Sequence, residues 1–194
     1  SNIYLAGAQD NGSNLFTTAG INSTIEVTGG DGAYCFISQN NPELMITSYV
    51  YNNYYFTLNG WDTFFSSDSD NSGNFINQAD YDDEADVLYA TRNSNEIAVY
   101  SNISSGSESK SVKTVNIGGR QTSNIKVSPY TDNRIIVGTE GGEVYIIDNA
   151  NGTTPSVTNI DNNDLPGGNV SSIDIGASDD HLFVTYSNYG VTSV

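Results

Sequence analysis

Four groups of short apolar segments follow one another along the chain at a nearly constant interval. Ile37, Tyr81, Val127 and Ile175 occupy equivalent positions in these groups, with separations of 44, 46 and 48 residues. Each group has the order strand, polar turn, strand, turn rich in Gly or Asn, strand. A period of about 40–50 residues with several short strands is typical of β-propeller blades. The repeat therefore predicts an all-β fold, a segment of a β-propeller.

Several predicted strands are apolar at consecutive positions, as in residues 135–137 and 182–184. A strand with one face in water alternates between apolar and polar residues, so continuous runs indicate cover on both faces. Neighbouring blades supply that cover in a propeller. A parallel βαβ sheet would do so as well, but no amphipathic helix separates the strands. The best helical candidate, residues 82–86, is shorter than two turns.

The repeat divides the chain into three nearly complete four-stranded blades and two partial ones, all in a single propeller segment. Since propellers usually close with about 4–8 blades, we expect an incomplete ring and a fragment of a longer chain. Neighbouring blades or another chain would then cover the open ends. The predicted blades cover approximately residues 1–30 (partial), 31–68, 74–117, 120–161 and 168–194 (partial).

The charge balance excludes two classes of partner. Lys and Arg total 6 against 23 Asp and Glu, which gives a formal net charge of -17. A nucleic-acid binder needs a basic face to displace counterions from phosphate, and an anionic membrane surface attracts basic segments. No apolar run approaches the roughly 20 residues that span a bilayer. The sequence thus predicts no nucleic-acid partner and no membrane insertion.

Three short segments resemble the propellers of the Asp-box (BNR-type) group. These segments are residues 7–12, residues 29–34 and residues 37–42. The Asp-box itself reads Ser/Thr-x-Asp-x-Gly-x-Thr-Trp, and residues 57–64 are a degenerate copy. Thr57 and Thr63 match, Asn59 replaces Asp, Trp61 stands at the Gly position, and Phe64 replaces Trp.

The resemblance implies a secreted or cell-surface protein. The group includes sortilin-like domains, xyloglucanase-like glycoside hydrolases and large exported proteins of Bacteroidota-type bacteria, which often carry a sorting domain. The Asp-box is a hairpin clip and implies no activity. We therefore expect a non-catalytic module that binds a glycan or a protein. The alternatives are a piece of a glycoside hydrolase and a structural spacer without a ligand.

A hydrolase would need two carboxylates about 5–9 Å apart on either side of the glycosidic bond. Asp10 and Asp31 are the candidates, because both follow strands in Gly-rich turns. The structural interpretation is that each carboxylate caps its turn, and we favour it. For ligand binding we single out Tyr51, Tyr54 and Trp61, whose rings could stack on sugars. Tyr side chains also fill the space between blades.

A calcium site is the one cofactor hypothesis. Residues 68–73 resemble the start of a calcium loop, in which oxygen ligands alternate and a Gly permits a sharp turn. The candidate ligands are Asp68, Asp70, Ser72 and Asp80, although the Glu expected at the twelfth position is missing. A solvated loop is the alternative. The acidic run of residues 80–86 is likewise predicted to be a wet loop, with a metal site as the alternative.

Overall fold

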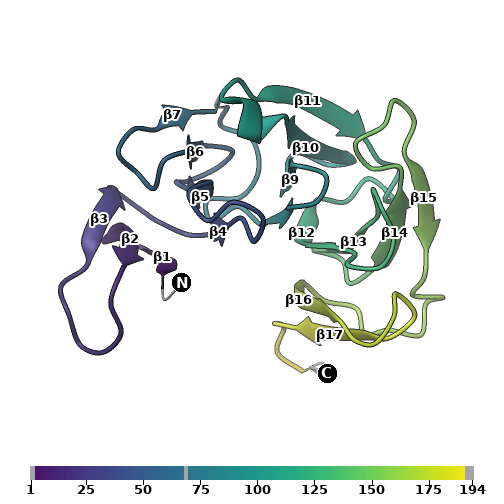
Figure 1. Cartoon of the computed structure of the whole chain (residues 1–194). Helices are drawn as coiled ribbons and strands as arrows, with labels where there is room; N and C mark the ends of the chain where they lie inside the picture. The colour runs from purple at the N-terminus through teal and green to yellow at the C-terminus, as the bar shows by residue number, and fades with distance from the viewer. Residues whose placement is uncertain (1–2, 68–69, 191–194) are drawn as a thin grey trace. The chain divides into compact units, whose positions relative to one another are not determined.

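A computed structural model describes residues 3–67 and 70–190, and all regular structure in these ranges apart from one short turn is β-strand (Figure 1). The exception is a single 3-10 turn, η1 (Ile103–Ser105). No helix in these ranges is long and apolar enough to cross a bilayer. The prediction of an all-β chain is confirmed.

In the described residues the strands form five small antiparallel sheets, and within each sheet every strand is hydrogen-bonded to the next one along the chain. Three sheets have four strands, the first has three and the last has two. The first sheet contains β1 (Tyr4–Ala8), β2 (Gly12–Phe16) and β3 (Ile25–Thr28), and the second contains β4 (Cys35–Ile37), β5 (Met45–Ser48), β6 (Tyr54–Thr57) and β7 (Phe65–Ser66). The third contains β8 (Ala79–Asp82), β9 (Val87–Thr91), β10 (Glu96–Ser101) and β11 (Ser109–Thr114), and the fourth contains β12 (Thr122–Val127), β13 (Ile135–Thr139), β14 (Val144–Asp148) and β15 (Ser156–Asn159). The last contains β16 (Val170–Ile175) and β17 (Leu182–Tyr186).

The four equivalent positions of the sequence repeat occupy the same place in their sheets. Ile37, Tyr81, Val127 and Ile175 lie in β4, β8, β12 and β16, the first strands of their sheets. In the helical candidate, residues 82–86, Asp82 ends β8 and residues 83–86 form a turn instead of a helix. The fourth strand of the second sheet, β7, has only two residues.

Asn and Asp residues in left-handed backbone conformation form the tight turns between strands. Asp86, Asn95 and Asn133 have φ values of 55°, 58° and 57°, and they lie in the β8–β9, β9–β10 and β12–β13 turns. Asn and Asp tolerate this conformation better than other non-glycine residues, because their short polar side chains bond to the local backbone. The turn composition therefore fixes where each strand ends.

The chain divides into two compact units, which are described separately below. The N-terminal unit contains residues Ser1–Asn77 and Tyr100–Lys110. The C-terminal unit contains residues Gln78–Val99 and Ser111–Val194.

The core of the N-terminal unit combines aromatic rings with a buried amide network. Tyr54, Phe56 and Tyr100 are almost fully buried, and the ring centroids of the two tyrosines are 5.2 Å apart. Asn77 donates its side-chain amide to Asn52 Oδ1 at 2.9 Å and to the Tyr54 hydroxyl at 3.2 Å. Both asparagines are fully buried, so this network satisfies polar groups that would otherwise destabilise the core.

Two neighbouring sheets pack face to face in the C-terminal unit. Ile97 and Val99 of β10 belong to one buried cluster with Ile135, Val137 and Ile147 of β13 and β14, and all five are completely buried. This packing explains the apolar runs, because the opposite face of β13 is covered as well. There Ile136 belongs to a second cluster with residues of β16 and β17.

Candidate functional site

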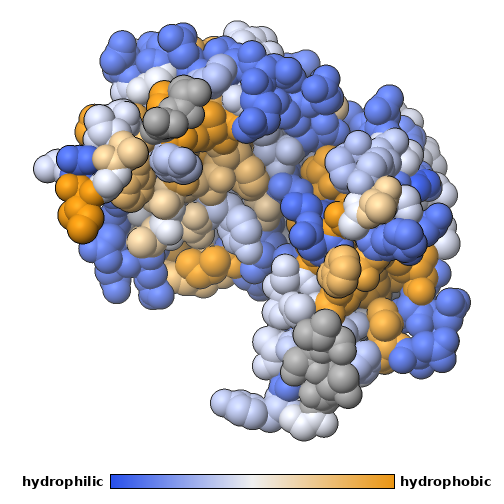
Figure 2. All heavy atoms as spheres, turned by 60° about the horizontal axis from the view of Figure 1, so that its bottom comes forward, coloured by the Kyte–Doolittle hydropathy of each residue, from blue (hydrophilic) through white to orange (hydrophobic). Residues whose placement is uncertain are grey.

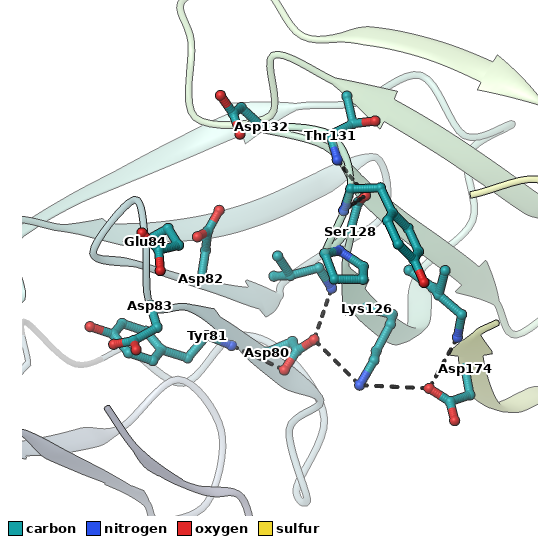
Figure 3. A pocket seen from close by; sticks show the side chains of 14 residues that line it. Asp80, Tyr81, Asp82, Asp83, Glu84, Lys126, Ser128, Thr131, Asp132 and Asp174 are labelled. Carbon is teal, nitrogen blue, oxygen red and sulfur yellow. Dashed lines mark hydrogen bonds and ion pairs between the residues drawn. The ribbon is translucent and has the colours of Figure 1, made fainter. Parts of the chain in front are cut away.

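An acidic groove of about 490 Å³ lies where β8, β12 and β16 end in the C-terminal unit (Figure 3). Its walls come from residues 80–84, residues 126–132 and residues 174–175. Six carboxylates and one lysine line the groove. They are Asp80, Asp82, Asp83, Glu84, Asp132 and Asp174, with Lys126 among them.

Asp80 joins the first strands of two sheets. Its Oδ2 accepts the backbone N–H of Val127 at 2.8 Å, and its Oδ1 accepts the N–H of Tyr81 at 3.1 Å. Burial is the largest influence on the carboxyl and raises the pKa of Asp80, although the Val127 amide and Lys126 act in the opposite direction. Asp80 is therefore a structural carboxylate at the floor of the groove.

Lys126 lies between two carboxylates (Figure 3). Its Nζ is 3.9 Å from Asp80 Oδ2 and 4.0 Å from Asp174 Oδ1. One lysine cannot neutralise six carboxylates, and the side chain of Asp174 is 75% exposed. Glu84 and Asp132 are exposed as well. The groove thus has a negative potential that is directed into solvent.

Tyr130 forms a fixed aromatic wall of the groove. Its hydroxyl donates to the Gly176 carbonyl at 2.5 Å, and its backbone N–H donates to Ser128 Oγ at 3.0 Å. The residue is nevertheless 54% exposed. A tyrosine held at both ends offers contact area with little loss of conformational entropy on binding. It can also attract a cation over its ring.

The sequence analysis singled out Asp80 and the acidic run but not Lys126, Tyr130, Asp132 or Asp174. A signal for two of these was present in the repeat. Asp80, Lys126 and Asp174 each precede a repeat position by one residue. The first strands of these neighbouring sheets, β8, β12 and β16, lie side by side, so residues equivalent in the repeat converge on one site.

Asp10 and Asp31 meet in a turn. Asp31 Oδ1 accepts the backbone N–H of Asp10 at 2.9 Å, and Asp10 has a φ of 63° in the β1–β2 turn. The Asp31 carboxylate therefore caps the turn in which Asp10 lies. This contact fits the structural interpretation of the pair.

The three aromatic candidates lie in different environments. Tyr54 is only 1% exposed, and burial raises the pKa of its hydroxyl. A ring so deeply buried has no face for a sugar, so Tyr54 is a core residue and not a ligand contact. Tyr51 is partly buried with its ring edge-on to Phe75, at a centroid distance of 5.9 Å. Trp61 is partly buried, and its centroid is 6.1 Å from that of Phe64.

Side-chain hydrogen bonds close the turn formed by residues 57–63. Thr57 Oγ1 accepts the N–H of Trp61 at 3.0 Å and donates to the Thr63 carbonyl at 2.7 Å. Asn59 Oδ1 accepts the N–H of Thr63 at 3.0 Å. The polar side chains thus bond turn amides. Phe64, which follows the turn at the Trp position of the Asp-box pattern, is 55% exposed.

Three of the four calcium candidates lie among the described residues. Asp68 lies outside the described residues. Asp70 accepts the Ser72 N–H at 2.9 Å and the Lys110 ammonium at 2.6 Å. Burial raises the pKa of Asp70, but hydrogen bonds from Lys110 and Ser72 outweigh it and lower the pKa to about 2. Asp80 belongs to the C-terminal unit. In residues 3–67 and 70–190, no group of three or more His, Cys, Asp or Glu could hold a metal ion.

Comparison of the sequence with protein-family models and with curated proteins finds no match.

Proposed function

We propose that the chain is a β-propeller segment that binds a partner without catalysing a reaction, and that the acidic groove takes a Lys- or Arg-bearing segment of a protein. One observation carries this proposal. Equivalent positions of the repeat, Asp80, Lys126 and Asp174, lie in a groove with four further carboxylates and an exposed tyrosine. The four-stranded antiparallel sheets of this chain support the propeller part of the proposal, because propeller blades are sheets of this kind.

The charge of the groove suits a cationic ligand. Opposite charges speed association and select partners, and the effect weakens as salt screens them. The net charge of -17 adds a long-range attraction for basic partners. An Arg side chain of the partner would stack on the Tyr130 ring, and a Lys side chain would stack on it less well. A secreted or cell-surface location, which the resemblance implies, remains part of the proposal.

The test is a titration of the full chain with a fluorescent oligo-arginine peptide, with oligo-glutamate as the control peptide. The triple variant Glu84→Gln, Asp132→Asn, Asp174→Asn removes three exposed groove charges. We expect it to weaken binding about tenfold, since three exposed pairs at about 0.5 kcal/mol each contribute about 1.5 kcal/mol. In the same variant, the dissociation constant is expected to change less steeply with salt concentration.

A matched control separates the groove from the overall charge of the protein. The triple variant Glu43→Gln, Asp62→Asn, Glu140→Gln removes the same charge from exposed positions outside the groove. It is expected to bind almost as well as the unmodified chain. Equal losses in the two variants would mean that binding is non-specific attraction, and the proposal would be wrong.

A further inference from the structure

Lys126 is held less closely by its carboxylates than Lys110 is by Asp70. Lys110 Nζ lies 2.6 Å from Asp70 Oδ2, and 11% of the Lys110 side chain is exposed. Lys126 Nζ lies 3.9 Å and 4.0 Å from its two carboxylates, and 38% of its side chain is exposed. Both distances are longer than a hydrogen bond. Exposed ion pairs of this kind contribute little to stability, so the Lys126 ammonium can leave its carboxylates at a small cost.

The two carboxylates beside Lys126 keep hydrogen-bond donors when the ammonium leaves. Asp80 accepts two backbone N–H groups. Asp174 Oδ1 accepts the backbone N–H of Ile175 at 3.0 Å, and the Asp174 side chain is exposed. Loss of an ion pair is costly where it leaves a buried charge uncompensated, and a cation from a ligand would compensate Asp80 again. This end of the groove, here called the lysine subsite (Asp80, Lys126 and Asp174), can therefore exchange its ammonium for a cation of the ligand.

A second cavity, of about 450 Å³, adjoins the first one and does not include Lys126. Its lining residues are Asp82, Glu84, Ala85, Asp132 and Asn133, and the three acidic ones also line the first cavity. In Figure 3 these three acidic residues lie apart from Lys126 and Asp174. Because the lining of this end, here called the acidic subsite, contains no Lys or Arg, a cation from a ligand enters it without displacing one.

We propose that Lys126 occupies one of two cation subsites of the acidic groove, and that the groove therefore selects partner segments with a single basic residue over runs of basic residues. The first basic residue of a partner enters the acidic subsite. A second one reaches Asp80 and Asp174 only by displacing Lys126, so its ion pairs replace existing ones and add little affinity. Specificity of this kind comes from a group that opposes the wrong partner. The role of Lys126 rests on the proposed function, the binding of a basic segment in this groove.

The experiment titrates the full chain with labelled glycine peptides that carry one arginine, or two arginines separated by one, two or three glycines. In the unmodified chain, the best two-arginine peptide is expected to bind no more than about twofold more tightly than the one-arginine peptide, because either arginine can enter the acidic subsite. In Lys126→Met this ratio is expected to rise to about tenfold, since two exposed ion pairs then form without the loss of others.

A matched variant separates this effect from the overall charge. Hydrophilic residues cover much of the face shown in Figure 2, and the net charge is -17, so basic peptides are attracted to many places besides the groove. Lys113→Met removes the same charge from β11, outside the groove, and is expected to leave the ratio unchanged. Nuclear magnetic resonance of labelled lysine gives a second readout in the unmodified chain. The Lys126 Cε signal is expected to shift with the two-arginine peptides and to change little with the one-arginine peptide.

Two results would overturn the proposal. One is a ratio that is the same in Lys126→Met and in the unmodified chain while Asp132→Asn still weakens binding of the one-arginine peptide, and this result would leave the proposed function standing. The other is an equal rise of the ratio in Lys113→Met. If no groove variant weakens binding of the one-arginine peptide, the proposed function is wrong and the role of Lys126 falls with it.

Discussion

Replacement of Asp179 by alanine is expected to lower the free energy of unfolding by about 2–3 kcal/mol, because the Ser128 and Thr131 hydroxyls lose a charged acceptor while Arg134 keeps its ion pair with Asp148. Asp179 is 8% exposed and follows β16. Its Oδ1 accepts the Ser128 hydroxyl at 2.6 Å, and its Oδ2 accepts the Thr131 hydroxyl at 2.7 Å and Arg134 at 3.0 Å. One carboxylate thus fastens the β12–β13 turn to the β16–β17 turn. Urea denaturation followed by circular dichroism measures the loss.

The neighbouring residue supplies the control. Asp180 is exposed, so Asp180→Ala is expected to change stability by less than about 0.5 kcal/mol. Burial is the largest influence on Asp179 and raises its pKa, but the bonds from Ser128, Thr131 and Arg134 outweigh it, and the pKa lies below its usual value. The stabilisation is therefore present above about pH 4, the unfolded value, and is lost as the pH falls through the folded pKa. A difference between Asp179→Asn and the unmodified chain that grows on acidification would contradict this account.

Replacement of Gly138 by valine is expected to destabilise the C-terminal unit by about 3 kcal/mol, at the upper end of overpacking effects. A Cβ at position 138 would lie 2.3 Å from Val170 Cγ1 and 2.5 Å from Val170 Cβ. Val170 is completely buried and its side chain is stiff, so it cannot move aside. Glycine therefore allows β13 and β16 to approach each other. The denaturant midpoint is the measurement.

Two comparisons test whether the contact between a Cβ at position 138 and Val170 causes the loss of stability. Gly167→Ala adds a Cβ that meets nothing within 4 Å, and it is expected to be nearly neutral. Gly138→Ala is expected to be tolerated better with Val170→Ala than without it, which a double-mutant cycle detects. Additive effects in that cycle would show that position 138 acts through its own backbone instead.

The strands were predictable from the sequence where burial on both faces leaves an apolar run. β13 and β9 are of this kind, because neighbouring packing leaves no polar position in their centres. The bounds of the outer strand β7 could not be predicted in this way, since only Phe65 and Ser66 are in strand. Outer strands have a weak pattern because one face is in water.

The candidate site was predictable only in part. The acidic run of residues 80–86 stands out in the sequence, but Asp174 joins it through the packing of sheets distant in the chain. Packing between segments distant in the chain also buries Tyr54, which was predicted from the sequence to bind a ligand. Local aromatic composition does not distinguish a ring packed edge-on against Tyr100 in the core from an exposed ring. The partners of Asp179 are 45 to 51 residues away, and no local pattern predicts them.

Face-to-face packing of the sheets β8–β11, β12–β15 and β16–β17 brings their first strands into one groove. Methyl-labelled nuclear magnetic resonance of the full chain tests it most directly. The account predicts nuclear Overhauser contacts between the methyl groups of Ile97 and Val99 in β10 and those of Ile135 and Val137 in β13. Contacts between Ile135 and its strand partner Ile147 serve as the internal reference. Reference contacts without the contacts between sheets would contradict the stacked arrangement and, with it, the groove.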